Sequence, residues 1–349
     1  MCEPILLVQG LSKTFARPPA LFERIQGVRS APIRPALFDV SVTLLPAEIL
    51  GIVGESGSGK STLARCIALL TTPDAGSVIF EGVDLTRLRG DALRRRRRRI
   101  QVVYQDPYSS LNPRLSVGGA LSEVLRVHRL VERDRVDDRV AELLEQVGMS
   151  RSTRNRYPAD FSGGQRQRIC IARALAAVPS VLIADEAASA LDVSVQAQIV
   201  NLLLDLRARL GLGMIFISHN LHLVHHVAAR IAVMFGGRIV ESLPADVPLE
   251  DAVHPYTRAL LTAMPRLDSP EMMIKPPSAD LAVALPVDGC PFRERCPLAH
   301  DLCAIADAAL LPFGPGHLVA CHALTPGQVE SDSGLGLEAA PTYGGGARN

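Results

Sequence analysis

The sequence has almost no net charge and no long apolar run, and its first residues do not follow the pattern of a signal peptide. Each of these absences makes a class of protein unexpected. Its 37 lysine and arginine residues nearly balance 36 aspartate and glutamate residues, so no field over the whole chain attracts nucleic acid, and we expect no nucleic-acid partner. Even the most apolar stretch, 171–184, is interrupted by Arg173 and Pro179, so we expect no membrane-spanning helix. A signal peptide has a basic region followed by an apolar one, whereas Met1 to Pro4 contain an acidic residue and a proline. We therefore expect no secretory signal peptide.

The chain is long and apolar enough for two folded parts. It has 349 residues, of which 48% are hydrophobic, and this length exceeds one ordinary core. We expect one domain over residues 1–245, a second over 246–325 and a disordered tail over 326–349, where glycine, serine and acidic residues show no apolar period. Residues 16–36 combine prolines and arginines without a period and should form an irregular insertion.

A phosphate-binding loop is the clearest motif. Residues 54–61 match G-x-x-x-x-G-K-[ST], between an apolar run at 49–53 and a helix-like segment. The glycines let successive N–H groups face phosphate oxygens, Lys60 would reach the β- and γ-phosphates, and the Ser61 hydroxyl would bind Mg²⁺. A glycine-rich turn without a ligand is the alternative. The predicted nucleotide-binding residues here are Gly54, Glu55, Ser56, Gly57, Ser58, Gly59, Lys60, Ser61 and Thr62.

Polar residues end three further strand-like runs. Gln105, the pair Asp185 and Glu186, and His219 each follow a run of apolar residues. Because strands of an α/β sheet present ligands at their carboxyl ends, we expect Asp185 to hold Mg²⁺ and Glu186 to orient an attacking water. His219 would hydrogen-bond the γ-phosphate. A surface acidic pair is the alternative for Asp185 and Glu186.

A helical insert separates two of these runs. Apolar residues recur at helical spacing between 136 and 147, and we expect a helical subdomain over about 106–165. It ends in a Ser-Gly-Gly-Gln sequence that opens the next helix and would offer a second anion-binding helix end. An ordinary loop is the alternative. The residues concerned are Ser162, Gly163, Gly164 and Gln165.

Two other features have competing interpretations. Phe15 ends the first strand-like segment and would either stack on an adenine ring or lie in the core. Six consecutive arginines at 94–99 are interpreted as a solvated helix end, with a phosphate contact as the alternative.

In their order along the chain, these motifs resemble the nucleotide-binding subunit of ATP-binding-cassette (ABC) transporters, over about residues 5–245. The resemblance implies an α/β fold, a P-loop NTPase cassette with a mixed RecA-like sheet, an antiparallel β subdomain and a helical insert. It implies an active ATPase, because the departures Phe161 and Ala187 remove no chemical group. The catalytic residues would be Glu186, His219 and Gln105, the Mg²⁺ ligands Ser61, Gln105 and Asp185, and the adenine-stacking residue Phe15.

Within that family, the segments 105–113 and 254–261 and the cysteine-containing tail resemble the ATPase subunits of oligopeptide and dipeptide importers. Such a subunit implies a second cassette, either a paralogue or a second copy, whose signature completes the ATP site. It also implies two transmembrane permease subunits, an extracytoplasmic substrate-binding protein, and a peripheral location on the cytoplasmic face of the membrane. The alternatives are import of nickel or another small solute, and a soluble ABC ATPase outside transport.

Four of the seven cysteines lie close together near the end of the chain: Cys290, Cys296, Cys303 and Cys321. In a reducing compartment such clustering indicates a metal site rather than disulfides. Their spacing is unlike the paired C-x-x-C of zinc ribbons, but thiolates bind either zinc or an iron–sulfur cluster and their softness alone does not decide between them. His300, His317 and His322 would allow a mixed cysteine and histidine zinc site. Resemblance to the peptide importers implies a [4Fe-4S] cluster. Zinc and unligated, partly buried thiols are the alternatives.

Overall fold

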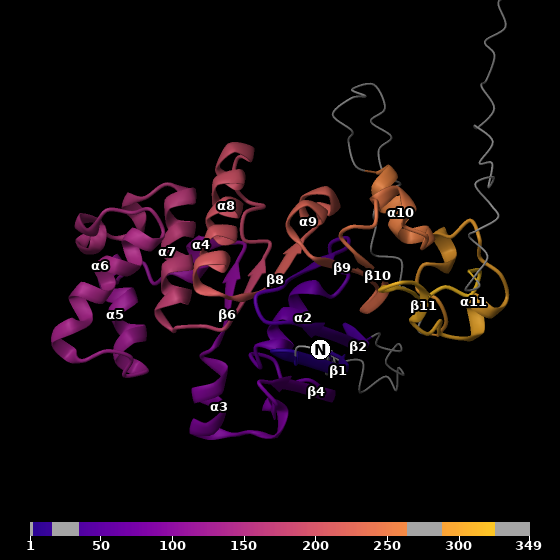
Figure 1. Cartoon of the computed structure of the whole chain (residues 1–349), viewed down its shortest axis with the longest axis horizontal. Helices are drawn as coiled ribbons and strands as arrows, with labels where there is room; N and C mark the ends of the chain where they lie inside the picture. Colours follow the sequence, from indigo (N-terminus) through magenta and orange to yellow (C-terminus); the bar gives the residue numbers. More distant parts are fainter. Residues whose placement is uncertain (1–2, 16–34, 264–287, 325–349) are drawn as a thin grey trace, which may run out of the picture.

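A central mixed sheet organises the chain, and a computed structural model describes it over residues 3–15, 35–263 and 288–324 (Figure 1). Its strand order is β11-β12-β10-β9-β3-β8-β7-β6. The strands from β9 to β6 pair in parallel, whereas β10, β12 and β11 continue the sheet in antiparallel fashion. The bounds are β3 (Ile49–Val53), β6 (Ile100–Tyr104), β7 (Val181–Asp185), β8 (Gly213–Ser218), β9 (Arg230–Phe235), β10 (Arg238–Pro244), β11 (Leu311–Gly314) and β12 (His317–Val319).

A second, antiparallel sheet has the order β2-β1-β4-β5. Its inward side chains, such as Leu6 and Leu44, are buried in one cluster with Ile52 of the main sheet and Leu63 of the first described helix. The two sheets therefore share a core with the helix that follows the phosphate-binding loop. The bounds are β1 (Leu6–Lys13), β2 (Leu37–Leu44), β4 (Ala75–Phe80), β5 (Val83–Asp84) and α2 (Lys60–Ile67).

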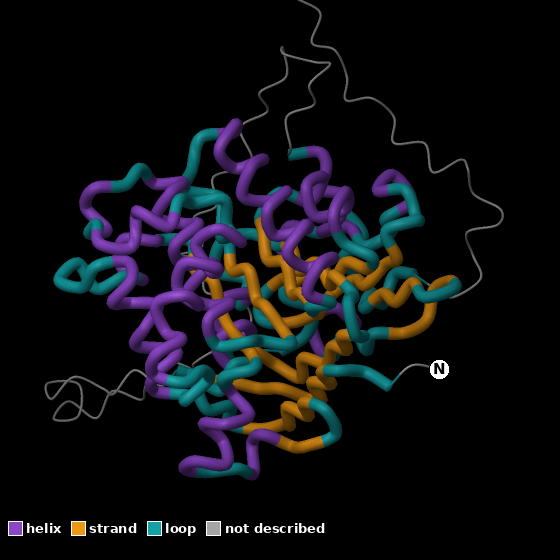
Figure 2. The backbone as a smooth tube through the Cα atoms, turned by 60° about the vertical axis from the view of Figure 1, so that its left-hand side comes forward, coloured by secondary structure: helices purple, strands orange, loops and turns teal. Residues whose placement is uncertain are grey.

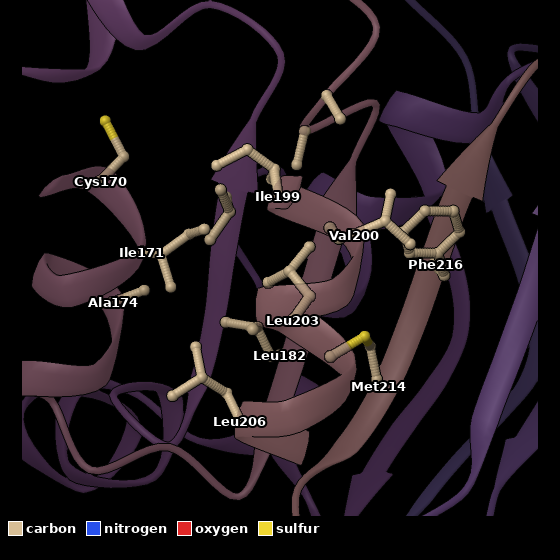
Figure 3. Packing of buried hydrophobic residues seen from close by; sticks show 14 of the residues in the cluster. Cys170, Ile171, Ala174, Leu182, Ile199, Val200, Leu203, Leu206, Met214 and Phe216 are labelled. Carbon is tan, nitrogen blue, oxygen red and sulfur yellow. The ribbon is translucent and has the colours of Figure 1, made fainter. Parts of the chain in front are cut away.

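Helices cover the main sheet, as Figure 2 shows. All residues of β7 and β8 are buried. Parallel strands that are covered by other elements on both faces are buried on both sides, and their sequences are therefore uninterrupted apolar runs. In Figure 3, Ile171 of α7 and Leu203 and Leu206 of α8 pack around Leu182 of β7. The bounds are α7 (Gly163–Ala176), α8 (Val193–Leu210), α9 (Leu221–Val227) and α10 (Pro255–Thr262).

A group of helices lies at one end of the molecule in Figure 1, away from the C-terminal strands. Among them are α5 (Val117–Val127) and α6 (Val136–Gln146). The same segment of the chain contains α4 (Pro107–Ser110) and the short turns η2 (Arg133–Arg135), η3 (Arg151–Asn155) and η4 (Pro158–Asp160). The expected α/β architecture, with its mixed sheet, antiparallel sheet and helical insert, is confirmed. Within the described residues, no helix has the length and apolarity needed to cross a membrane.

The C-terminal part is joined to the main sheet. Strand β12 pairs with β10 and β11 pairs with β12, so residues 311–319 extend the sheet at its edge. The remaining short elements are α11 (Leu302–Ile305), η5 (Leu249–Asp251) and η6 (Arg293–Arg295). The predicted insertion at 16–36, apart from Pro35 and Ala36, and the predicted tail at 326–349 lie outside the described residues.

The arginine run is more than a solvated helix end. Helix α3 (Gly90–Arg97) follows the turn η1 (Leu85–Arg87), and only Arg94 and Arg95 of the run are exposed. Arg98 donates to the carbonyl of Ala177 at 2.9 Å, and Arg99 donates to Ser180 at 2.6 Å. The expectation of a solvated helix end therefore fits Arg94 and Arg95 but is wrong for Arg98 and Arg99, because these two guanidinium groups donate to carbonyl and hydroxyl groups of the chain that leads into β7.

Candidate nucleotide-binding site

The loop at 54–61 connects β3 to α2 and is closely packed. Gly59 has φ +107°, and a Cβ there would lie 2.6 Å from the carbonyl oxygen of Ala36, so a side chain is excluded on both counts. A Cβ on Gly54 would lie 2.2 Å from the carbonyl oxygen of Met234. The Lys60 ammonium donates to the carbonyl oxygens of Gly54 at 2.7 Å and Glu55 at 2.9 Å. The conformation of the loop therefore depends on the missing side chains of Gly54 and Gly59 and on the hydrogen bonds of the Lys60 ammonium to loop carbonyls.

The two carboxylates at the end of β7 face this loop. Ser61 Oγ donates to Asp185 Oδ1 at 3.1 Å. Burial raises the pKa of the Asp185 carboxyl, the Ser61 hydrogen bond opposes that rise, and the negative charge of Glu186 adds to it. Glu186 Oε1 lies 3.8 Å from the Lys60 ammonium, and Oε2 lies 3.8 Å from Nδ1 of His219. The structure therefore brings together Lys60, Ser61, Asp185, Glu186 and His219.

Glu186 occupies an unusual backbone position. Its φ is +50°, a left-handed conformation that costs energy for a residue with a side chain. The backbone N–H of Glu186 donates to the carbonyl of Ile217 at 3.0 Å, and Ser189 Oγ donates to the Glu186 carbonyl at 3.0 Å. These contacts hold the backbone conformation, and Ser189 Oγ also contacts Oε2 of the carboxylate at 3.4 Å.

Two cavities open beside the loop. One of about 250 Å³ is lined by Lys60, Ser61, Gln105 and Glu186. The other, of about 470 Å³, is lined by Ser61, Gln105 and Asp185 together with Arg173. Gln105 and Ser61 line both cavities, and the predicted Mg²⁺ ligands Ser61, Gln105 and Asp185 all line the one of about 470 Å³.

These residues fit a nucleotide and its Mg²⁺ ion. The first N–H groups of α2 have no partner within the helix and point toward the loop, as an anion requires. Ser58 Oγ is buried and has no hydrogen-bond partner in the described chain, so a polar group remains to be satisfied there. Burial lowers the pKa of Lys60 against the opposing fields of Glu186 and Asp185, and a phosphate beside the ammonium would favour its charged form. Hydroxyl, amide and carboxylate oxygens are the ligands that Mg²⁺ prefers.

The predicted signature opens helix α7. Ser162 Oγ accepts from the backbone N–H of Gln165 at 3.4 Å, and the Gln165 side chain accepts from the backbone N–H of Ser162 at 3.1 Å, which is a capping box. A Cβ on Gly164 would lie 2.4 Å from Cγ1 of Val195, so glycine allows α7 to approach α8. In the described part of the chain, Ser162, Gly163 and Gly164 line neither cavity beside the loop.

Phe15 lies apart from these groups. Its side chain is 53% exposed and follows β1. The Lys13 ammonium lies 5.7 Å from the centre of its ring. An exposed ring is free to stack on a base, and its role as the adenine contact stays a prediction.

Sequence reasoning missed two residues that touch the loop. Tyr256 of α10 and Arg295 of η6 both contact Glu55, across 201 and 240 residues of sequence. Tyr256 and Arg295 both stood inside segments that resemble peptide importers, but nothing in those segments indicated a contact with the loop. Contacts between residues so distant in sequence leave no local pattern.

The cysteines do not form a compact metal-ion site. Within the described residues, no three or more histidine, cysteine, aspartate or glutamate side chains are arranged to hold a metal ion. Burial raises the pKa of Cys290, Cys296 and Cys321, the last to about 11, with smaller contributions from neighbouring thiols. The zinc and [4Fe-4S] predictions are therefore unsupported by this geometry, and neutral thiols account for it.

Comparison with known proteins identifies the family. Residues 37–189 match the ABC transporter model, and residues 240–303 match the C-terminal region of oligopeptide/dipeptide transporters. A probable peptide ABC transporter ATP-binding protein of Sinorhizobium fredii is 46% identical over 93% of this chain and 92% of its own length. A putative peptide import ATP-binding protein of Brucella ovis is 44% identical over 91% of this chain and 97% of its own.

A longer relative and a solved structure are similar to the chain as well. A glutathione import ATP-binding protein of Pectobacterium atrosepticum is 44% identical over 92% of this chain and 49% of its own length. A dimeric ATP-binding cassette bound to ADP and phosphate has a TM-score of 0.59 and 27% identity, over 69% of this chain and 98% of its own. The geometry of Lys60, Asp185 and Glu186 and these matches lead to one conclusion: the chain belongs to the ABC transporter family of ATPases, in the branch that carries the oligopeptide/dipeptide transporter C-terminal region.

Proposed function

We propose that this chain is the ATP-hydrolysing subunit of an importer of oligopeptides or dipeptides. The match of residues 240–303 to the oligopeptide/dipeptide transporter C-terminal region is the observation that carries this cargo class. Relatives named for peptide import and for glutathione import support it, because glutathione is itself a short peptide.

ATP would be held at the loop between β3 and α2. The N–H groups of the loop and of the α2 N-terminus would bind the phosphates, and Lys60 would exchange its two carbonyl partners for phosphate oxygens. Mg²⁺, when bound, neutralises charge on the β- and γ-phosphates. Ser61, Asp185 and Gln105 would hold it, since they border one cavity, and Phe15 would stack on the adenine.

Glu186 would orient the attacking water and accept its proton. Its fixed backbone and its position 3.8 Å from both Lys60 and His219 support this role. His219, which is 62% exposed at its side chain, would contact the γ-phosphate from the open side of the site. Gln105 lines both cavities and would report the occupancy of the site to the helices that follow it.

A second cassette would complete the site. The signature at the start of α7 offers N–H groups to an anion but lines neither cavity of its own chain, which supports a role at the site of a partner cassette. Closure of two cassettes on ATP and their separation after hydrolysis would move two permease subunits. We include an extracytoplasmic substrate-binding protein as the source of cargo, and place the chain on the cytoplasmic face of the membrane.

The cysteine site is a separate part of the proposal. A [4Fe-4S] cluster would be held by Cys290, Cys296, Cys303 and Cys321. The one supporting observation is that Cys290, Cys296 and Cys303 lie near enough to Cys321 to add to the rise that burial causes in the pKa of the Cys321 thiol. Iron and sulfide analysis with a visible spectrum of anaerobically purified protein tests it. Zinc in the same analysis, or neither metal, would contradict the cluster.

The proposed function is tested by ATP hydrolysis in reconstituted membranes. We expect turnover by the chain to rise when its permease subunits, its partner cassette and a peptide-loaded binding protein are present, and labelled peptide to accumulate in the vesicles. The Glu186→Gln chain is the matched control and should abolish both signals. Turnover that ignores the membrane partners would contradict the transport role.

A further inference from the structure

The C-terminal part of the chain contacts the phosphate-binding loop at Glu55 through hydrogen bonds. Arg295 Nη2 donates to Glu55 Oε1 at 2.9 Å, and Arg295 Nη1 donates to Glu55 Oε2 at 3.0 Å. This paired arrangement matches the fork of guanidinium to the two oxygens of a carboxylate. It restrains the direction of the side chain as well as its distance.

The backbone of the same residue is held by a second group. Tyr256 Oη accepts the backbone N–H of Glu55 at 2.8 Å. Tyr256 is fully buried, and its ring centre lies 4.5 Å from that of Phe235 and 5.4 Å from that of Phe292. The Arg295 guanidinium lies 5.3 Å from the centre of the Phe292 ring. Both contacts to Glu55 therefore come from side chains that are themselves fixed by aromatic packing.

Glu55 is also tied to the nucleotide side of the loop. Its carbonyl oxygen, with that of Gly54, accepts a hydrogen bond from the Lys60 ammonium, and the Ser58 backbone N–H donates to the Glu55 carbonyl at 3.2 Å. The segment is thus fixed from the C-terminal part on one side and from Lys60 on the other. When ATP draws Lys60 away, the contacts from Tyr256 and Arg295 remain.

We infer that Tyr256 and Arg295 are positioning residues of the ATP site, which keep the loop in its phosphate-binding shape and so set the affinity for nucleotide. The physical reason is preorganisation: a loop that is already ordered loses less conformational freedom when phosphate binds. The C-terminal part is in this way an element of nucleotide binding and not only of transporter assembly. The inference rests on the proposed placement of ATP at this loop.

The test measures the dissociation constant for ATP and the steady-state kinetics of the full chain. We expect Arg295→Gln and Tyr256→Phe to raise the dissociation constant and KM by about three- to ten-fold with kcat little changed, a modest coupling because Arg295 is partly exposed. Arg293→Gln is the matched control, since Arg293 lies in the same turn and donates only to carbonyls of Asp288 and Ala304 in the described chain. It should bind ATP like the unaltered protein.

Two further variants separate positioning from simple charge attraction. In Arg295→Lys the positive charge stays but the fork is lost, so we expect affinity as weak as in Arg295→Gln. In a Glu55→Gln background, Arg295→Gln should cause no further loss, because Arg295 acts through Glu55. Full rescue by lysine, or additive losses in the double variant, would overturn the inference.

Further results of these measurements would refute either the role of Arg295 or the proposed ATP site. Equal losses in Arg293→Gln and Arg295→Gln would mean that any damage to this turn has the same effect, and would refute the specific role. Should Tyr256→Phe not fold, Arg295→Gln still decides, because that side chain is partly exposed. Lys60→Ala tests the ATP site itself: unchanged ATP binding there refutes the proposed site, whereas loss there with normal binding in Arg295→Gln refutes only this inference.

Discussion

Replacing Glu186 by glutamine removes the proposed base while preserving its shape. The backbone contacts of residue 186 to Ile217 and Ser189 do not depend on the charge of the side chain. The amide oxygen of glutamine can still accept the 3.4 Å contact that Ser189 Oγ makes with Glu186 Oε2, so the loop should keep its form. A positioned base contributes about 10²–10⁴ in rate, which corresponds to about 3–5 kcal/mol in the activation barrier. We therefore expect kcat for ATP hydrolysis to fall by about that factor.

The affinity of Glu186→Gln for ATP should not fall with its turnover. The Glu186 carboxylate lies in the cavity that borders Lys60 and Ser61, where it repels phosphate oxygens. Glutamine removes that repulsion, so the affinity for ATP should stay the same or rise. A rise in affinity with a fall in turnover cannot come from unfolding, which would lower both.

The assay compares phosphate release with equilibrium binding of ATP for the same preparations. Glu142→Gln is the control, because Glu142 lies on α6, pairs with Arg139 and is half exposed, and its loss should leave turnover unchanged within about two-fold. Turnover by Glu186→Gln within ten-fold of the unaltered protein would refute the assignment of Glu186 as the base.

Three other changes have expected outcomes. Lys60→Ala should weaken ATP binding by at least about ten-fold, measured by equilibrium binding, because a buried cation at the phosphates is lost. Gly164→Ala should lower stability by about 1–3 kcal/mol in urea denaturation, since its Cβ would overlap Val195; unchanged stability would mean that α7 and α8 move apart freely. Burial lowers the pKa of His254 to about 4, below the usual value near 6.5, so the unfolded chain takes up a proton first and stability should fall as pH drops from about 6.5 to 4. His254→Asn, which keeps a cap for the helix start, should lose much of that pH dependence, and an identical pH profile would contradict the argument.

Much of the site was predictable because each of its parts is a local pattern. The glycines and Lys60 of the loop, and the carboxylates at the end of β7, follow from short motifs joined to apolar runs. Parallel strands then bring Ser61 and Asp185 to one edge without further information. Uninterrupted apolar runs in the sequence also predicted the buried strands β7 and β8.

What could not be predicted depends on contacts between distant segments. The approach of Arg295 and Tyr256 to Glu55 requires the C-terminal part to lie against the loop, and no periodicity records that. The arginine run looked like a uniform block of charge, yet Arg98 and Arg99 bond to atoms of the chain before β7. Which members of a charge run become hydrogen-bonded to other segments is decided by packing, which the run itself does not encode.

The pairing of β12 with β10 limits where the chain can be truncated without exposing a strand edge. By motifs, the cassette ends near residue 245, just after β10 (Arg238–Pro244). A chain ended there would expose the backbone N–H and C=O groups of Glu241 and Ser242 that now face Val319 and Leu318. An uncovered strand edge of this kind recruits other chains. It would also leave the Glu241 carboxylate, fully buried and 2.7 Å from His317, without its partner, so a shortened cassette should be prone to aggregate even though every ATP-binding motif is present.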